Sequence, residues 1–199
     1  MVGGERAHKD PCSPSGRRGG HSSAPTLRRI RKRQSSKQRQ PQPLHMPFSV
    51  AVKDRLMYSH TFTFDDGVPF TTGCTSVVTA SLEGPSLGPH DILIDICVAQ
   101  QLLRECCALY DHKNLDTLNE FVRADGTLMN TTVEVMARAL YRQLHARLLE
   151  HHRQHAATDG KGLGAVTSMR ITLEESDVAS ASYYEASAAG LFGFPQSRL

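Results

Sequence analysis

Asp111-His112-Lys113-Asn114-Leu115-Asp116 is the stretch that decides the fold, because it separates two segments with helical hydrophobic periodicity. Two acids, an imidazole and an amide make it more polar than a connection between two helices needs. Loops between rigid elements often carry binding and catalytic groups. The alternative interpretation is a solvated turn in which Asn114 and the aspartates cap helix ends.

A helix is predicted on each side of this stretch. Before it, residues 92–96 open a segment whose apolar residues recur at three- and four-residue steps, and this helix should end near Tyr110. After it, Thr131 and Glu134 have the spacing of a capping box that opens a second amphipathic helix. The polar run at residues 151–155 predicts a frayed end for that helix.

Four segments have the alternation or the β-branched and aromatic content of strands: residues 48–64, 75–83, 166–173 and 178–184. Residues 65–67 supply a turn signal, and Pro69 is expected to delay the second strand. The order is strand, strand, helix, helix, strand, strand. It predicts an α+β fold, a four-stranded antiparallel sheet (ββααββ) with two helices on one face. Its two open edges favour assembly into a larger barrel.

The N-terminal segment differs sharply in charge from the rest of the chain. Eleven of the 23 Lys and Arg residues and two of the 20 Asp and Glu residues lie in residues 1–45, a formal charge of +9. The remaining 12 basic and 18 acidic residues give −6. Because residues 1–45 have few aliphatic side chains, we expect a disordered basic tail that binds nucleic acid or an anionic surface, serves as an organellar address, or is a solvated extension. Met46 is a candidate alternative start.

The predicted folded domain spans residues 46–186, and residues 187–199 form a flexible tail. Five cysteines, with no signal-peptide pattern, favour free thiols in a reducing compartment. No apolar run reaches the roughly 18 residues of a membrane span. The final Ser197-Arg198-Leu199 is a close variant of a peroxisomal address, so we expect a peroxisome or related organelle, with the cytoplasm or mitochondrion as alternatives.

Several motifs resemble those of the 6-pyruvoyltetrahydropterin synthase and 6-carboxytetrahydropterin synthase family. The 111–116 stretch is the most specific of them, and the resemblance runs from about Phe48 to Tyr184. Three further segments are similar to family motifs at the start of the first helix, the start of the second helix and the third strand: Ile94-Asp95-Ile96, Asn130-Thr131-Thr132-Val133-Glu134 and Leu173-Glu174-Glu175-Ser176. The resemblance implies the tunnelling fold, assembled into a barrel as a homo-oligomer, commonly a hexamer.

It also implies a carbon–oxygen lyase of tetrahydropterin metabolism that acts on 7,8-dihydroneopterin triphosphate. Zinc would polarise the substrate's side chain, while Asp111, His112 and a cysteine move protons. Glu175 would grip the amino and N–H edge of the pterin with two hydrogen bonds. Thr131 and Thr132 would line the pterin pocket.

The zinc motif departs from the family pattern. His60 matches the first zinc histidine, but the His-Gly-His motif that follows reads Thr72-Gly73-Cys74. Cys74 can ligate zinc as a thiolate, whereas Thr72 is not a credible ligand. A third ligand would have to come from His90 or from a neighbouring subunit.

Other roles remain open for these residues. Cys74 can instead be a displaced nucleophile or base, and Asp65 and Asp66 can act as a base or as metal ligands. His60 and Cys74 can also be ordinary packing residues, and Glu175 a solvated strand corner.

Two functions therefore follow from the resemblance. The first is a metal-dependent pterin lyase. The second is a catalytically altered or inactive pterin-binding assembly that lacks the full zinc triad. A weaker third idea, an association with nucleic acid, depends on the basic tail alone.

Overall fold

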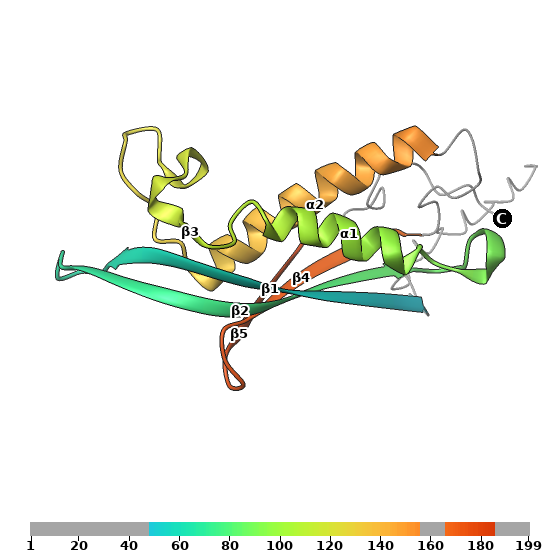
Figure 1. The fold of residues 1–199 in the computed structure, drawn as a ribbon, viewed down its shortest axis with the longest axis horizontal. Coiled ribbons are helices and arrows are strands. Elements are labelled where there is room, and N and C mark those ends of the chain that lie inside the picture. The colour runs from blue at the N-terminus through green and yellow to red at the C-terminus, as the bar shows by residue number, and fades with distance from the viewer. Residues whose placement is uncertain (1–47, 156–165, 186–199) are drawn as a thin grey trace, which may run out of the picture. The chain divides into compact units, whose positions relative to one another are not determined.

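A computed structural model describes residues 48–155 and 166–185 of the chain. The predictions for residues 1–45, for Met46 and for the C-terminal Ser197-Arg198-Leu199 lie outside this part and stay predictions. Seven main elements follow one another: β1 (Phe48–Thr63), β2 (Pro69–Gly84), α1 (Ile96–Cys107), β3 (Lys113–Asn114), α2 (Val133–His155), β4 (Ser168–Glu174) and β5 (Ser180–Tyr184). Both helices lie on the same face of one sheet (Figure 1), which confirms the predicted α+β architecture.

The sheet has five strands in the order β3-β1-β2-β4-β5, one more than predicted. The extra strand is β3, two residues inside the 111–116 stretch that pair in parallel with Tyr58 and Ser59 of β1. Every other neighbouring pair is antiparallel. A two-residue strand has no hydrophobic alternation of its own, so sequence patterning cannot reveal it.

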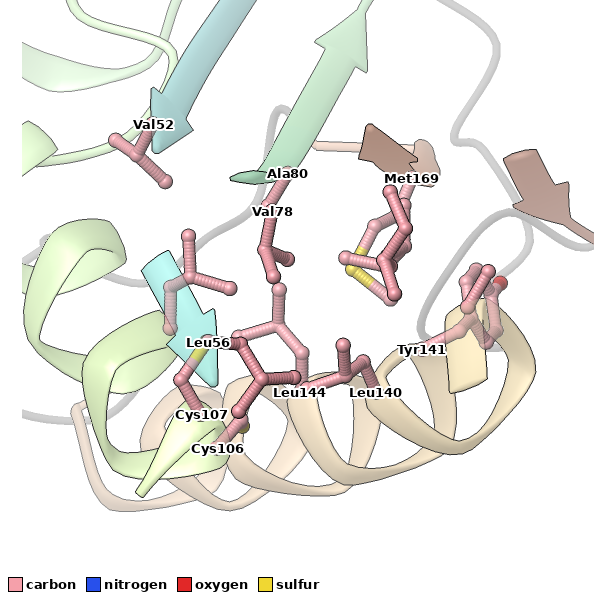
Figure 2. Packing of buried hydrophobic residues seen from close by; sticks show 14 of the residues in the cluster. Val52, Leu56, Val78, Ala80, Cys106, Cys107, Leu140, Tyr141, Leu144 and Met169 are labelled. Atoms are coloured by element: carbon pink, nitrogen blue, oxygen red, sulfur yellow. The ribbon is translucent and has the colours of Figure 1, made fainter. Parts of the chain in front are cut away.

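The core lies between the helices and one face of the sheet, because alternate strand residues point to opposite faces. The even-numbered residues of β1 and β2 pair with one another and face the helices. Leu56 and Val78 on the strands are fully buried with Leu140 and Leu144 on α2 (Figure 2). α1 packs against β1, whereas α2 packs against β4 and β5.

The β1–β2 turn confirms the signal at residues 65–67. Gly67 adopts a φ of 70°, where side chains other than glycine's are strained, and its N–H donates to the Phe64 carbonyl at 2.9 Å. Pro69 does not delay the second strand. It is the first residue of β2 and pairs with Thr63, a position where the missing N–H is tolerated.

The predicted helix ends also need correction. α1 begins four residues later than predicted, because the Asp95 carboxylate accepts the N–H groups of Cys97 at 2.8 Å and Val98 at 3.4 Å and so caps the helix. α2 continues through His155 instead of fraying at residue 151. Contacts four residues apart support its last turn: His155 Nδ1 lies 2.9 Å from the His151 carbonyl oxygen, and the two rings stack at 4.1 Å.

No helix in the described ranges combines the length and the apolar character needed to cross a membrane. The four cysteines in these ranges are free thiols, as predicted. Cys106 and Cys107 lie on the buried face of α1, and burial raises the pKa of the Cys106 thiol to about 11 and that of the Cys107 thiol to about 12.

Raising the pH from 9 to 10 is expected to lower the free energy of unfolding. In this range the unfolded chain loses thiol protons that Cys106 and Cys107 keep in the folded state, so the unfolded state binds fewer protons. Each thiol should contribute a loss of up to about 1.4 kcal/mol per pH unit. Urea unfolding in reducing buffer at pH 8, 9 and 10 measures this slope.

Cys106→Ala should reduce the slope, whereas replacing the exposed Cys97 by alanine should leave it unchanged. An unaltered slope in the Cys106 variant would mean that this thiol does not contribute.

Candidate functional site

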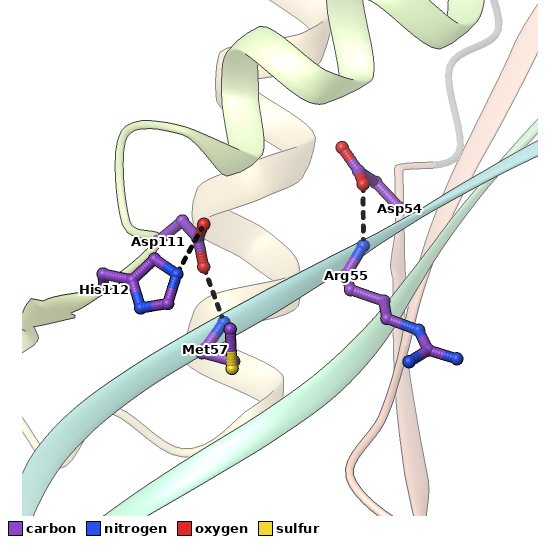
Figure 3. A network of polar contacts seen from close by, with 5 residues as sticks. All are labelled: Asp54, Arg55, Met57, Asp111 and His112. Carbon is purple, nitrogen blue, oxygen red and sulfur yellow. Dashed lines mark hydrogen bonds and ion pairs between the residues drawn. The ribbon is translucent and has the colours of Figure 1, made fainter.

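Asp111 and His112 lie in the turn that follows α1, where the chain turns back along the edge of β1 (Figure 3). His112 has a φ of 57°, in the left-handed region, and its N–H donates to the Met57 carbonyl at 2.6 Å. Asp111 Oδ1 accepts the N–H of Met57 at 2.9 Å, and Asp111 Oδ2 lies 3.6 Å from His112 Nε2. The sheet thus anchors one oxygen of the carboxylate, while the other faces the imidazole, whose side chain is 69% exposed.

Side chains from this connection cover the rest of the same strand edge. Asp116 Oδ1 accepts the N–H of Thr61 at 3.1 Å. Asn130 accepts the N–H of Thr63 at 2.9 Å and donates to its carbonyl at 2.8 Å. Asn114 caps a short 3₁₀ turn by accepting the Asp116 N–H at 3.0 Å. The interpretation that Asn114 and the aspartates cap helix ends is therefore confirmed for Asn114, which caps the 3₁₀ turn, and wrong for Asp111 and Asp116, which cap a strand edge.

Glu175 follows β4, on the sheet face that carries the helices. Its Oε1 accepts a hydrogen bond from the Tyr58 hydroxyl at 3.3 Å and one from the Cys74 thiol at 3.2 Å. The Cys74 sulfur also lies 3.2 Å from the Ser76 hydroxyl oxygen. Burial is the main cause that raises the pKa of both the Tyr58 phenol and the Cys74 thiol above their usual values, so both groups are protonated donors at neutral pH.

His60 is buried beside this group and is held by Thr131. His60 Nδ1 lies 2.8 Å from the Thr131 carbonyl oxygen and 3.0 Å from its hydroxyl oxygen. The His60 ring also contacts the rings of Tyr58 and Phe62, with centroids 5.2 and 4.4 Å apart. Since the carbonyl of Thr131 is an acceptor, Nδ1 carries the proton and Nε2 is left as an acceptor.

The predicted capping box is shifted by one residue. Thr132, not Thr131, caps α2, because its hydroxyl accepts the N–H of Val135 at 3.4 Å. Thr131 is turned to His60 instead. The expected contacts of both threonines with a ligand stay predictions.

The residues predicted to bind zinc share one face of the sheet. In the β1–β2 register Thr72 is opposite His60, and Cys74 is opposite Tyr58. However, within residues 48–155 and 166–185 no three His, Cys, Asp or Glu side chains are grouped to hold a metal ion. Thr72 supplies only a hydroxyl, and the thiol of Cys74 donates to a carboxylate. The residues present therefore do not fit a three-ligand zinc site within one chain.

The other residues considered as ligands lie at the ends of the hairpin. Gly84, which precedes His90, pairs with Phe48 at the far end of β1 from His60. The twelve residue steps from Phe48 to His60 span about 40 Å at 3.3 Å per residue, so His90 does not complete the site within the chain. Asp66 belongs to the opposite end, where its carboxylate accepts the N–H of Val68 at 3.1 Å. The adjacent Asp65 is exposed in the same turn.

A hollow of about 370 Å³ lies where residues 112–114 meet β1 and β2. It is lined by Met57, Tyr58, Ser59, Gly73, Cys74, Thr75, His112, Lys113 and Asn114. His112 and Cys74 both line this hollow, but four of its six strand residues (Met57, Ser59, Gly73 and Thr75) are in the odd-numbered phase that faces away from the helices. Glu175 is on the helix face and is not one of the lining residues.

Sequence reasoning missed Tyr58 and Ser76. Both are in the same alternation phase as a predicted residue on their own strand, Tyr58 with His60 and Ser76 with Cys74. Residues two apart on a strand share a face, so this alternation could have predicted that Tyr58 and Ser76 lie beside His60 and Cys74.

Comparison with known proteins gives both a family and a fold. Residues 49–186 match the family described as 6-pyruvoyl tetrahydropterin synthase. No curated protein sequence matches the chain significantly.

Three solved 6-pyruvoyl tetrahydropterin synthases resemble the structure. The Plasmodium vivax protein has a TM-score of 0.52 and 16% identity, covering 69% of this chain and 97% of that one. The Plasmodium falciparum protein has a TM-score of 0.52 and 12% identity, with coverages of 71% and 99%. The Caenorhabditis elegans protein has a TM-score of 0.50 and 15% identity, with coverages of 71% and 98%. At these identities the structural similarity shows the fold alone.

Proposed function

The chain belongs to the 6-pyruvoyl tetrahydropterin synthase family, and on that premise we propose that it binds a pterin at Glu175 and acts as a pterin-synthase-like lyase. The orientation of Glu175 is the observation that supports this most. Its carboxylate is half-buried and held by Tyr58 and Cys74 through one oxygen. A carboxylate in such a place suits the amino and N–H edge of a pterin, which offers only donors.

The finer proposal is that the substrate is 7,8-dihydroneopterin triphosphate and that the first step is an elimination. A base takes a proton from carbon, the electron pair forms a C=C bond, and the neighbouring C–O bond breaks to release the phosphate chain. His112 is the proposed base, because its exposed imidazole lines the hollow and an imidazole nitrogen can accept a proton from carbon. Asp111, anchored on the backbone of Met57, would stabilise the imidazolium that forms.

We also propose a homo-oligomer, in keeping with the resemblance to hexameric enzymes. Side chains of the same chain bond the edge of β1 from Lys53, whose carbonyl accepts from Gln100 at 2.8 Å, to Thr63. In the described residues no side chain bonds the backbone of β1 before Lys53, so a second sheet can pair there. Analytical ultracentrifugation of the full chain tests this proposal, and a monomer at micromolar concentration would refute it.

A second candidate function is a pterin-binding assembly that does not catalyse the reaction. Thr72 and Cys74, where the resemblance expects two histidines, favour this candidate, since the residues that the structure describes do not group three metal ligands in one chain. Two measurements on the purified full chain separate the candidates: its zinc content and the release of phosphate from 7,8-dihydroneopterin triphosphate. Pterin binding without phosphate release would identify the assembly.

Glu175→Gln is expected to weaken pterin binding by roughly 10- to 100-fold. Removing the charge costs a charge-assisted hydrogen bond worth about 1.5–3 kcal/mol, while the side chain keeps its size. Titration of 7,8-dihydroneopterin, followed by its fluorescence, measures the dissociation constant. Glu174→Gln is the matched control, because Glu174 pairs with Val77 and points to the opposite face of the sheet. Equal losses in the two variants would show that Glu175 has no special role.

A further inference from the structure

Cys74 occupies a position at which the resemblance expects a metal ligand, but its hydrogen bonds indicate another use. A thiol has one proton, and here it is donated to Glu175 Oε1 over 3.2 Å. The Ser76 hydroxyl, 3.2 Å from the sulfur, must then be the donor in that contact. Ser76, Cys74 and Glu175 therefore form a directed chain of hydrogen bonds that ends on a carboxylate.

The Tyr58 hydroxyl donates to the same oxygen at 3.3 Å. A carboxylate oxygen has two lone pairs, so these two donors saturate Oε1. No hydrogen bond to Oε2 is present in the described part of the chain. The two donors come from β1 and β2 and the carboxylate follows β4, so three segments of the sheet together set the orientation of Glu175.

This arrangement is incompatible with metal ligation by the same sulfur. A cysteine binds metal as a thiolate, and a thiolate 3.2 Å from the Glu175 carboxylate would place two like charges in contact at a half-buried site. It would also remove the proton that the carboxylate accepts. In the second predicted ligand, His60, the hydrogen bonds to Thr131 occupy Nδ1, so only Nε2 is available to a metal ion.

We propose that Cys74 is a positioning residue: its thiol, together with the Tyr58 hydroxyl, orients the Glu175 carboxylate for pterin binding, and Cys74 does not bind a metal ion. The inference rests on the proposed function for the identity of the ligand, but the thiol–carboxylate contact does not depend on it. Oε2 of Glu175 can then accept a hydrogen bond from the pterin. A pterin N–H can bond Oε1 only if it shares that oxygen with the Cys74 thiol and the Tyr58 hydroxyl or displaces one of them.

The first test is infrared spectroscopy of the S–H stretch in the reduced full-length protein, without pterin. Subtracting the spectrum of Cys74→Ser isolates the band of this thiol from those of the other cysteines. We expect a band at pH 7 that moves to higher frequency in Glu175→Gln, because a neutral amide oxygen is a weaker acceptor than a carboxylate. A missing band, or a band that does not move, would overturn the proposal.

The second test is pterin affinity in a series of variants. Cys74→Ala should weaken 7,8-dihydroneopterin binding by about tenfold, and Cys74→Ser, which keeps a donor, should restore the affinity to within about threefold. Tyr58→Phe should weaken binding to a similar extent as Cys74→Ala. Cys97→Ala, which removes an exposed thiol on α1, is the control and should bind normally.

Three outcomes contradict the proposal: equal affinity in all variants, no rescue by serine, or stoichiometric zinc in the purified protein that Cys74→Ser loses. If the wild-type protein does not bind the pterin but the S–H band shifts as expected, the proposed function fails and the thiol–carboxylate contact stands.

Discussion

His112→Asn is expected to slow phosphate release from 7,8-dihydroneopterin triphosphate by about 100- to 10,000-fold, the range for loss of a general acid or base. Asparagine is the appropriate replacement because His112 has a φ of 57°, a left-handed conformation that asparagine tolerates better than alanine. The side chain is 69% exposed, so folding should be nearly unaffected. Pterin affinity should change little, because Glu175 provides the proposed anchor.

Asp111 offers a matched pair of variants for the same step. Asp111→Asn keeps an oxygen to accept the Met57 N–H but removes the charge that faces His112. Asp111→Ala removes both. We expect the asparagine variant to fold normally and react more slowly, whereas the alanine variant should also lose stability. A wild-type rate of phosphate release in His112→Asn would exclude His112 as the base. An unchanged rate in Asp111→Asn would mean that Asp111 caps the strand edge and takes no part in the proton transfer.

Leu144→Ala is expected to lower the free energy of unfolding by about 2–5 kcal/mol. Leu144 is 1% exposed on α2, within the buried cluster between this helix and the strands (Figure 2). The variant loses apolar contact and leaves a cavity that neighbouring side chains fill only partly. Since a domain of this kind is stable by about 5–15 kcal/mol, a large part of its stability should be lost. Urea unfolding measured by circular dichroism gives the value.

Leu128→Ala is the control for that measurement, because the same atoms are removed from a side chain that is 46% exposed. Its effect should stay near 0.5 kcal/mol or below. Similar losses in the two variants would mean that the buried cluster around Leu144 is looser than the structure indicates.

The fold could be predicted from local patterns, and the errors lie where local patterns end. Hydrophobic periodicity found both helices and the four longer strands. It did not place the start of α1, because that depends on the Asp95 cap, nor the two residues of β3, whose partner residues on β1 lie 55 positions earlier. The polar side chains of residues 151–155 predicted a frayed end, but contacts between residues one helical turn apart keep this segment helical.

The sequence predicted which residues form the candidate site, but it did not predict which of their side chains contact one another. Alternation along β1 and β2 puts His60, Thr72 and Cys74 on one face, as the motif comparison required. It does not say which groups those side chains meet. The thiol of Cys74 meets the carboxylate of Glu175, which follows β4 and lies 101 residues later in the chain. Such a pairing depends on the strand order, which a single sequence does not specify.

The cover on the edge of β1 has a consequence for how the chain folds as it is synthesised. The β1–β2 hairpin can form once β2 is complete at Gly84, but the side chains that cover its edge, those of Asp111, Asp116 and Asn130, are made 27, 32 and 46 residues later. At the usual 5–20 residues per second, they arrive roughly 1–9 s after the hairpin. Until then a nascent chain has a bare strand edge with which neighbouring chains can pair. Slower translation through residues 64–130 should therefore increase aggregation during expression, even though the finished protein keeps this edge covered.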